Sequence, residues 1–372
     1  MRSSVLVAAL SFSTAVFAAP TWHDWIDSWK PSHASGLEGY ALDNPLGPTT
    51  GGKGGKAITV KTVEELVAAV AGDSPKIIYL DGEFRPSSRL VVGSNTSLLG
   101  KGKGANIIGE GINIYNAANV IVRNISVRFV EGGDGMTVQN STRVWVDHCE
   151  FESEISLELG PDFYDGQLDI VRASDWMTVS YNYFHGKSSF SALQSLPLTS
   201  FRSLTNLPTL TDHWKSSLVG NSDVLREVDE GHLHITYHHN FWQNIGTRGP
   251  AGRFGHQHIY NNLYEDFLYQ AIHSRSDNQV LVEANKFMGD TRTALTTYGL
   301  VVPEDSPNTC VCGDEELDGF ANLGAKNDFG DAIVNITQVG DFTKAGYKYK
   351  LTPLKLLESV VRKNVGLGKV KV

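Results

Sequence analysis

Three carboxylates near the middle of the chain have the spacing of ligands for one cation. Asp165 and Asp169 belong to one short Asp-Gly-Gln-Leu-Asp run, and two residues four apart in a β-strand project from the same face. Asp134 precedes them by about one turn of the repeat described below, so it would lie beside them. Three carboxylates on one face repel one another unless a cation joins them, and hard oxygen ligands favour Ca²⁺. The alternative is that these are unrelated turn aspartates.

Basic side chains follow further along the chain. Arg248 and Arg253 lie five residues apart across a Pro/Gly bend, and Lys215 precedes them by about one coil. Fixed guanidinium groups suit carboxylates held by two parallel hydrogen bonds. Alternatively, these arginines pair with the acidic excess of the chain itself. The sequence has no Gly-x-Ser-x-Gly elbow, Walker loop or dinucleotide fingerprint, so the usual markers of acyl transfer and nucleotide chemistry are missing.

Short segments rich in Val, Ile, Thr and aromatic residues recur along the chain and would position these side chains. Each ends in a small polar residue, and most intervals between these residues are in the twenties, which is typical of a solenoid; the column is Asn124, Cys149, Asn182, Asn240, Asn262 and Asn285. Asn side chains stacked at a bend can hydrogen-bond along the stack. We therefore predict an all-β fold, a right-handed single-stranded parallel β-helix. The run from Thr62 to Val70 predicts a short N-terminal helix that caps the first coil.

One interval is much longer than the others. Asn182 and Asn240 are 58 residues apart, and between them lies the segment 186–211, which has no acidic residue and no strand periodicity. Removing its 26 residues reduces the interval to 32, close to the preceding one. The segment is either a surface loop or a retained intron. We predict a retained intron, because Gly-Lys-Ser can encode a splice donor and the length is in frame.

The N-terminus predicts export. Residues 1–18 have a basic start, an apolar run and small residues at the end, the pattern of a signal peptide, and no later stretch is long and apolar enough to span a bilayer. We expect a secreted, monomeric protein with one domain over residues 19–372, of which 303–372 form a C-terminal extension. Sequons that permit glycosylation in that compartment begin at Asn95, Asn124, Asn140 and Asn335.

Charge and cysteine content narrow the partners. The 372 residues carry a net charge of −9, which argues against nucleic acid as a partner. The tail 341–372 is +6 by itself, so we expect it to be solvated, with docking on the acidic body as the alternative. Three cysteines, Cys149, Cys310 and Cys312, allow one intramolecular disulfide and do not support a zinc site.

Several motifs together resemble the pectate lyases of the pectate/pectin lyase superfamily, the secreted fungal ones in particular. The likeness runs from about residue 36 to about residue 300; it rests on Trp145-Val146-Asp147-His148, Asp165-Gly166-Gln167-Leu168-Asp169-Ile170, Val179-Ser180-Tyr181-Asn182-Tyr183-Phe184-His185, and Arg248-x-Pro250-x-x-Arg253-Phe254-Gly255 followed by His258-Ile259-Tyr260-Asn261-Asn262. That family has a right-handed parallel β-helix fold, in agreement with the repeat.

The resemblance implies a Ca²⁺-dependent β-elimination of polygalacturonate. It implies Ca²⁺ ligands at Asp134, Asp165 and Asp169, a catalytic base at Arg248, and substrate-carboxylate contacts at Lys215 and Arg253. Asp147 matches a family signature without a metal role, and we expect it to support the cleft. An arginine normally stays protonated, so cations around Arg248 must lower its pKa, and we predict an alkaline optimum.

Three other functions remain open at this point. A pectin lyase acting on methyl-esterified substrate would lack the acidic Ca²⁺ set. A hydrolase with this fold would need a pair or trio of carboxylates for acid and base work, and no Asp-Asp pair is present. A non-catalytic module that binds wall polysaccharide is the third, if the segment 186–211 belongs to the protein and displaces Lys215.

Overall fold

The computed structural model describes residues 36–154, 162–186, 213–301 and 312–372. The chain divides into two units, residues 1–30 and 31–372, and every described residue belongs to the second. The predicted signal peptide and all of the segment 186–211 except Gly186 lie outside the described residues, as does Cys310. No helix of the described part is long and apolar enough to cross a membrane.

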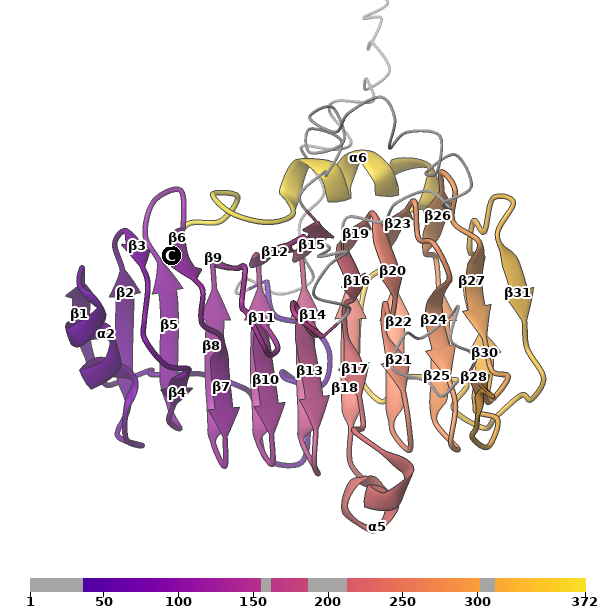
Figure 1. The fold of residues 1–372 in the computed structure, drawn as a ribbon, viewed down its shortest axis with the longest axis horizontal. Helices are drawn as coiled ribbons and strands as arrows, with labels where there is room; N and C mark the ends of the chain where they lie inside the picture. The colour runs from indigo at the N-terminus through magenta and orange to yellow at the C-terminus, as the bar shows by residue number, and fades with distance from the viewer. Residues whose placement is uncertain (1–35, 155–161, 187–212, 302–311) are drawn as a thin grey trace, which may run out of the picture. The chain divides into compact units, whose positions relative to one another are not determined.

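Three long parallel sheets make up most of the second unit (Figure 1). The chain passes from the nine-stranded sheet to the ten-stranded sheet, then to the eight-stranded sheet, and back to the nine-stranded sheet one coil further on. Each strand pairs in register with the equivalent strand of the next coil, for example Met136 with Leu168 and Val144 with Met177. The predicted all-β parallel β-helix is confirmed.

Within each sheet the strands stack in the order in which they occur along the chain. The ten-stranded sheet contains β1 (Lys56–Val60), β2 (Lys76–Leu80), β5 (Thr96–Gly100), β8 (Ala118–Arg123), β11 (Thr142–Asp147), β14 (Asp175–Ser180), β18 (His234–His238), β22 (His256–Tyr260), β25 (Gln279–Glu283) and β30 (Phe320–Leu323). The nine-stranded sheet contains β4 (Leu90–Val92), β7 (Ile112–Tyr115), β10 (Met136–Gln139), β13 (Leu168–Val171), β17 (Leu218–Val219), β21 (Ala251–Gly252), β24 (Gln270–Ser274), β27 (Thr293–Thr296) and β31 (Ile333–Asn335).

The remaining strands and the helices complete the described structure. The eight-stranded sheet contains β3 (Glu83–Phe84), β6 (Ala105–Ile108), β9 (Ile125–Arg128), β12 (Glu150–Ser153), β15 (Tyr183–Gly186), β19 (Phe241–Gln243), β23 (Leu263–Glu265) and β26 (Lys286–Met288). Two short pairs are β16 (His213–Lys215) with β20 (Ile245–Thr247), and β28 (Leu300–Val301) with β29 (Asp314–Glu315). The helices are α2 (Val63–Val70), the 3₁₀ turn η1 (Asp223–Leu225), α5 (Arg226–Asp229) and α6 (Leu354–Asn364).

A ladder of buried Asn side chains joins successive coils. Asn182, Asn240, Asn262 and Asn285 each accept, through Oδ1, the backbone N–H of the preceding ladder residue at 2.8 to 3.0 Å. Asn327 extends the ladder by accepting from the backbone N–H of Asn285 at 2.9 Å. Asn182 and Asn240 are adjacent in it although they are 58 residues apart, so the extra residues leave the stack between β15 and β16.

The predicted column was wrong at its first member. The strand register places Arg123 opposite Asp147, so Asn124 is level with His148 and not with Cys149. Both residues have a positive φ, 60° for Asn124 and 49° for His148, as do later members of the same corner. Asn tolerates this left-handed conformation better than most residues, which is why an Asn stands there for a different reason.

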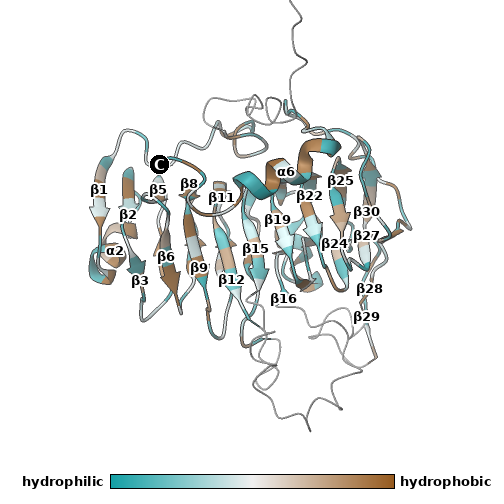
Figure 2. Ribbon diagram, turned by 90° about the horizontal axis from the view of Figure 1, so that it is seen from above, coloured by the Kyte–Doolittle hydropathy of each residue, from teal (hydrophilic) through white to brown (hydrophobic). Residues whose placement is uncertain are grey.

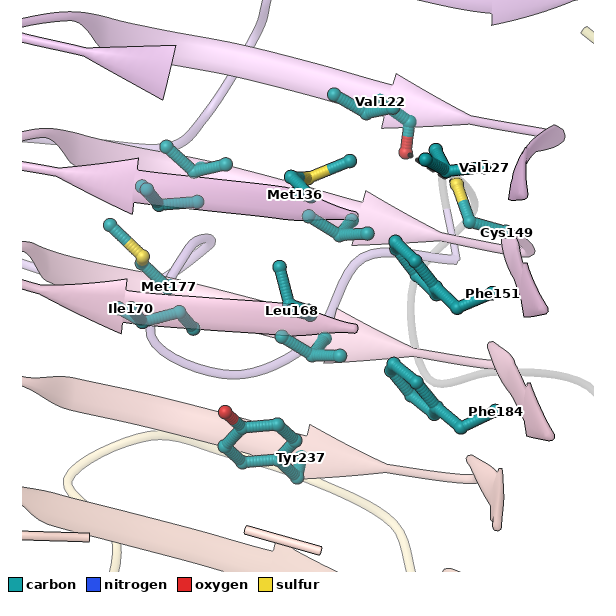
Figure 3. Close-up of a cluster of buried hydrophobic side chains, with 14 of the residues drawn as sticks. Val122, Val127, Met136, Cys149, Phe151, Leu168, Ile170, Met177, Phe184 and Tyr237 are labelled. Carbon is teal, nitrogen blue, oxygen red and sulfur yellow. Dashed lines mark hydrogen bonds between the residues drawn. The ribbon is translucent and has the colours of Figure 1, made fainter. Parts of the chain in front are cut away.

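Aromatic side chains stack inside the coils, in line with the strands of the eight-stranded sheet. The ring centroids of Phe151 and Phe184 are 5.0 Å apart, those of Phe184 and Trp242 are 4.0 Å apart, and Tyr264 and Phe287 continue the stack. Figure 3 shows the first two rings beside the buried thiol of Cys149. Cys149 is free, and burial raises its pKa to about 12, whereas Cys312 is disulfide-bonded. The buried aromatic area stabilises the stacking of one coil on the next.

The N-terminal helix begins where the sequence predicts it. Thr62 Oγ1 accepts the backbone N–H of Glu65 at 3.3 Å, and Glu65 Oε2 accepts the backbone N–H of Thr62, which completes a capping box. Leu66 and Val70 are buried in the main core. Figure 1 shows α2 beside β1 and β2, where it covers the first coil as predicted.

The basic tail is docked, so the expectation of a solvated tail was wrong. Helix α6 packs Leu357 and Val361 against Phe241 and Leu263 of the eight-stranded sheet (Figure 2). Its charges pair with the body, for example Arg362 with Glu265 at 2.8 Å.

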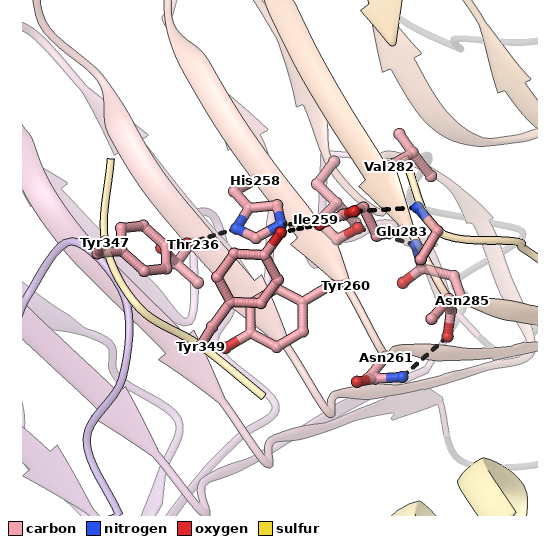
Figure 4. A network of polar contacts seen from close by, with 12 residues as sticks. Thr236, His258, Ile259, Tyr260, Asn261, Val282, Glu283, Asn285, Tyr347 and Tyr349 are labelled. Carbon is pink, nitrogen blue, oxygen red and sulfur yellow. Dashed lines mark hydrogen bonds and ion pairs between the residues drawn. The ribbon is translucent and has the colours of Figure 1, made fainter. Parts of the chain in front are cut away.

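The segment before α6 crosses the outside of the ten-stranded sheet. There the Tyr347 hydroxyl lies 2.6 Å from His258 Nδ1, and His258 Nε2 lies 2.9 Å from Glu283 Oε2 (Figure 4). Tyr349 donates its hydroxyl hydrogen to the same Glu283 oxygen. These contacts are buried, so they fasten the tail to the coils through polar groups as well as through the apolar face of α6.

Candidate functional site

The candidate residues gather where successive coils enter the nine-stranded sheet. Asp134 lies just before β10, and Asp165 lies just before β13. The two approaches are hydrogen-bonded, because Gly135 N donates to Gly166 O at 2.8 Å. Asp169 follows inside β13 with 8% of its surface exposed. The parallel register therefore brings together three carboxylates that are up to 35 residues apart in the sequence.

Two of these carboxylates face each other across Gly166. Asp134 accepts from the backbone N–H of Gly166 at 3.1 Å and from the Thr137 hydroxyl at 2.9 Å. A Cβ placed on Gly166 would lie 2.5 Å from Asp169 Oδ1 and 2.9 Å from Asp134 Oδ1. Any larger residue at this position would displace one carboxylate. Gly166 thus keeps open the space that both oxygens border.

Burial and mutual repulsion make these carboxylates hard to ionise. Burial, followed by the charge of Asp165, raises the pKa of Asp134. Burial and the charge of Asp134 raise the pKa of Asp169 well above its ordinary value, while Arg248 opposes the rise. A hard cation would relieve both effects, since it replaces the lost hydration and screens the repulsion. The donor set and the open space at Gly166 therefore fit Ca²⁺.

A second acidic group in the described residues is already neutralised by the protein. Glu150, Glu152 and His185 place one ligand atom each within 4.8 Å of one another on the eight-stranded sheet. Arg128, however, pairs with Glu150 at 3.2 Å and with Glu152 at 3.1 Å. His185 Nε2 lies 3.1 Å from Glu150 Oε1. We assign this group to the packing of adjacent strands.

Lys215 reaches the acidic residues from the end of β16. Its Nζ lies 2.6 Å from Asp165 Oδ1 and 2.5 Å from Asp162 Oδ1, and the residue is 2% exposed. His213 Nε2 lies 2.6 Å from the carbonyl oxygen of Lys215. Burial lowers the pKa of His213 to about 4, so at neutral pH this ring is uncharged and holds the strand by a hydrogen bond.

Arg248 lies one coil beyond Lys215, as predicted. The β16–β20 register pairs Lys215 with Thr247, so Arg248 follows directly after its partner. The residue has a φ of 70° between β20 and β21, and its backbone N–H donates to Gln270 O at 3.2 Å. Burial lowers the pKa of Arg248, and Arg253 lowers it further, while the aspartates oppose the change. A guanidinium with a lowered pKa is one that can lose a proton.

The guanidinium of Arg253 is engaged by the protein itself. Its Nε and Nη2 hold the two carboxylate oxygens of Glu316 at 3.0 and 2.5 Å, and its Nη1 donates to the carbonyl oxygens of Gly220 and Asn221. The exposed Asp223 approaches Nε to 3.7 Å. The expected substrate contact is therefore limited to the remaining Nη2 hydrogen and the charge.

Sequence reasoning missed several residues of this site. Arg89 donates to the backbone oxygen of Asp134 and to the Thr137 hydroxyl, both at 2.9 Å. Arg275 and Glu316 join Arg253 from positions 22 and 63 residues later. A lone Arg or Glu far along the chain has no local pattern, so only the coil register could have found them.

Asp147 does not support the cleft, contrary to expectation. Its carboxylate lies 2.7 Å from Arg123 Nε and 2.6 Å from His148 Nδ1, and it accepts from the Ser180 hydroxyl at 2.6 Å. These partners lie at the corner where the ten-stranded sheet leads into the eight-stranded sheet. The candidate residues lie at the entry to the nine-stranded sheet, so Asp147 stabilises a different corner of the coil.

Comparisons with known proteins agree with this arrangement. Residues 11–193 and 206–370 match the pectate lyase family model, and the unmatched stretch lies inside the segment 186–211. A pectate lyase A from Emericella nidulans is 36% identical over 363 residues, which cover 96% of this chain and 95% of that protein. A probable pectate lyase A from Aspergillus niger is 36% identical, covering 93% and 92% of the two chains.

Among solved structures, a pectate lyase from Bacillus sp. N165 in complex with trigalacturonate superposes with a TM-score of 0.69 and 28% identity, covering 90% of this chain and 99% of that one. A thermostable pectate lyase, with a TM-score of 0.66 and 22% identity, shares the fold. The chain belongs to the pectate lyase family, and it is an enzyme of the polysaccharide lyase class.

Proposed function

We propose that this pectate lyase cleaves polygalacturonate with Arg248 as the base, and with Lys215 and Arg253 near the substrate carboxylates. The observation that carries the proposal is the environment of Arg248. It is fully buried, its pKa is lowered, and it is electrostatically coupled to the three aspartates across adjacent coils. The trigalacturonate bound to the bacterial relative supports a galacturonate polymer as substrate.

The reaction is a β-elimination within one galacturonate unit. A neutral Arg248 takes the proton from C5, the electron pair of that C–H bond becomes the C4–C5 double bond, and the bond from C4 to its glycosidic oxygen breaks. The leaving oxygen acquires a proton from water. Positive charge near the uronate carboxylate favours the first step, because it stabilises the negative charge that develops next to C5.

Asp134, Asp165 and Asp169 would hold a Ca²⁺ ion. Their hard oxygen donors, their raised pKa values at Asp134 and Asp169, and the open space beside Gly166 all suit such an ion. When bound, Ca²⁺ would neutralise the substrate carboxylate and thereby make the C5 proton more acidic. The pairing of Lys215 with Asp165 would keep the lysine close to that carboxylate.

We further propose a secreted, monomeric glycoprotein that acts on plant cell-wall pectate. The apolar N-terminal run and the secreted family it resembles support export. Of the four sequons, Asn124 is buried and uses its side chain for Gly100 O and Gly368 N, whereas Asn140 and Asn335 are exposed. The retained-intron proposal for 186–211 stands, and a transcript containing those codons would refute it.

The alternative functions are not favoured. The matched relatives are named pectate lyases, which argues against a pectin lyase. A non-catalytic role required the segment 186–211 to displace Lys215, yet Lys215 lies 2.6 Å from Asp165 in the full-length chain.

Polygalacturonate cleavage followed by ultraviolet absorbance tests the proposal, because the double bond formed is conjugated with the carboxylate. We expect absorbance to grow with Ca²⁺ and to stop with a chelator, and Arg248→Lys to abolish it. The control is Arg85→Lys, an exposed arginine on the first coils. Reducing ends without absorbance would indicate hydrolysis, and near-normal turnover in Arg248→Lys would refute the base.

A further inference from the structure

One internal carboxylate joins the arginines on the far side of the cleft. Glu316 has 9% of its side chain exposed and lies just after β29. Its Oε1 receives Nη2 of Arg253 at 2.5 Å, and its Oε2 receives Nε of Arg253 at 3.0 Å. This is the bidentate geometry in which an Arg–carboxylate pair is strongest.

The same carboxylate holds a second arginine. Arg275 Nε lies 3.1 Å from Glu316 Oε2, and the Ser276 hydroxyl donates to that oxygen at 3.0 Å. Arg275 is 4% exposed. Burial alone would raise the pKa of Glu316, but Arg275 and Arg253 lower it, so the carboxylate is ionised at neutral pH. Two buried guanidinium groups therefore share one charge.

Without this carboxylate the two arginines would repel each other. Both also interact electrostatically with Arg248, the proposed base. Arg253 would then keep only two neutral backbone acceptors, Gly220 O and Asn221 O, on Nη1. An unpaired buried guanidinium turns toward water or another anion, because burying an uncompensated charge is costly.

We propose that Glu316 is a positioning residue, which fixes the plane of Arg253 so that its remaining Nη2 hydrogen and its charge face the substrate carboxylate. This inference rests on the proposed function. It assigns to Glu316 an effect on substrate binding and not on proton removal, because the residue acts through Arg253 and not on the reacting atoms.

Kinetics of Glu316→Gln on polygalacturonate test the proposal. The change keeps the size of the side chain and removes its charge. We expect KM to rise about 10- to 100-fold, the range for losing a hydrogen bond to a charged group, while kcat stays within about threefold. Partial unfolding would lower the active fraction, and hence kcat, and leave KM unchanged. A lower kcat with a normal KM would therefore overturn the proposal.

Two further variants separate position from charge. Glu315→Gln makes the same chemical change at the exposed neighbouring residue and should keep the wild-type KM. Glu316→Asp keeps the charge but is one methylene shorter, so it cannot reach both arginines; we expect its KM to rise as well. A wild-type KM in Glu316→Asp would show that charge alone matters and would refute positioning.

A measurement without substrate separates this inference from the proposed function. In protein labelled with ¹⁵N-arginine, the Nε–H signals of Arg253 and Arg275 should exchange slowly in the wild type and rapidly in Glu316→Gln. Unchanged exchange would overturn the inference even if the enzyme is active. A wild type without lyase activity would refute the proposed function and leave the exchange result interpretable.

Discussion

Gly166→Ala tests the cation site by adding a single methyl group. The new Cβ would lie 2.5 Å from Asp169 Oδ1 and 2.9 Å from Asp134 Oδ1, whereas ordinary contacts begin at 3.4 Å. At least one carboxylate must therefore move by about 0.5 to 0.9 Å, the difference between these distances, which is large against the ±0.2 Å tolerance of metal–ligand bonds. Neither Asp169, whose other contact is the backbone N–H of Leu218, nor Asp134, held by Thr137, can shift without losing a hydrogen bond.

We expect Ca²⁺ to bind Gly166→Ala about 10- to 100-fold more weakly, the range seen when the support of metal ligands is disturbed. Calorimetric titration with Ca²⁺ measures this directly, and lyase activity should be restored by higher Ca²⁺. Gly346→Ala is the matched control, since a Cβ there meets no atom within 4 Å. Unchanged Ca²⁺ affinity in Gly166→Ala would refute the placement of the ion between these carboxylates.

Four other predictions follow from the contacts described. Lyase activity should rise with alkaline pH, with a midpoint below 12.5, because Arg248 must lose its proton and its pKa is lowered; a flat profile of initial rates would contradict this. Asn262→Ala should destabilise the fold by about 1–3 kcal/mol for each buried group left unpaired, measured by urea unfolding. Glu283 has a folded pKa of about 2 against an ordinary 4.5, so its stabilising effect is present above pH 4.5 and is lost as pH falls toward 2; thermal melts of Glu283→Gln should show a weaker acid dependence. Mass spectrometry of protein from a fungal host should find glycan on Asn335 and none on Asn124, and a glycan on Asn124 would contradict its buried position.

The sequence carried the coil period because the same chemistry recurs at each coil. Buried Asn amides need partners, and the neighbouring coil supplies them, so Asn182 and Asn240 could be aligned across 58 residues. Asn124 misled the alignment since Asn also favours the left-handed corner conformation. One residue type served two physical needs, and sequence spacing alone does not separate them.

The site was predictable on its acidic side and much less so on its basic side. Asp165 and Asp169 lie close together in sequence, and the period brings Asp134 to them. The engagement of Arg253 by Glu316 depends on a contact between residues 63 positions apart, which no local pattern reveals. Docking of the tail was equally hidden, because net charge does not reveal that Leu357 and Val361 would meet a complementary apolar surface.

The Asn ladder gives the protein a length that can be changed in whole units. Asn240 and Asn262 are 22 residues apart, Asn262 and Asn285 are 23 apart, and each passes the same hydrogen bond in the same direction. A duplicated coil inserted at Asn262 would meet the donors and acceptors that the native coils already offer. Modular lengthening of this kind would extend the surface beyond the arginines without altering the acidic half of the cleft, so the number of sugar units in contact could be engineered separately from the chemistry.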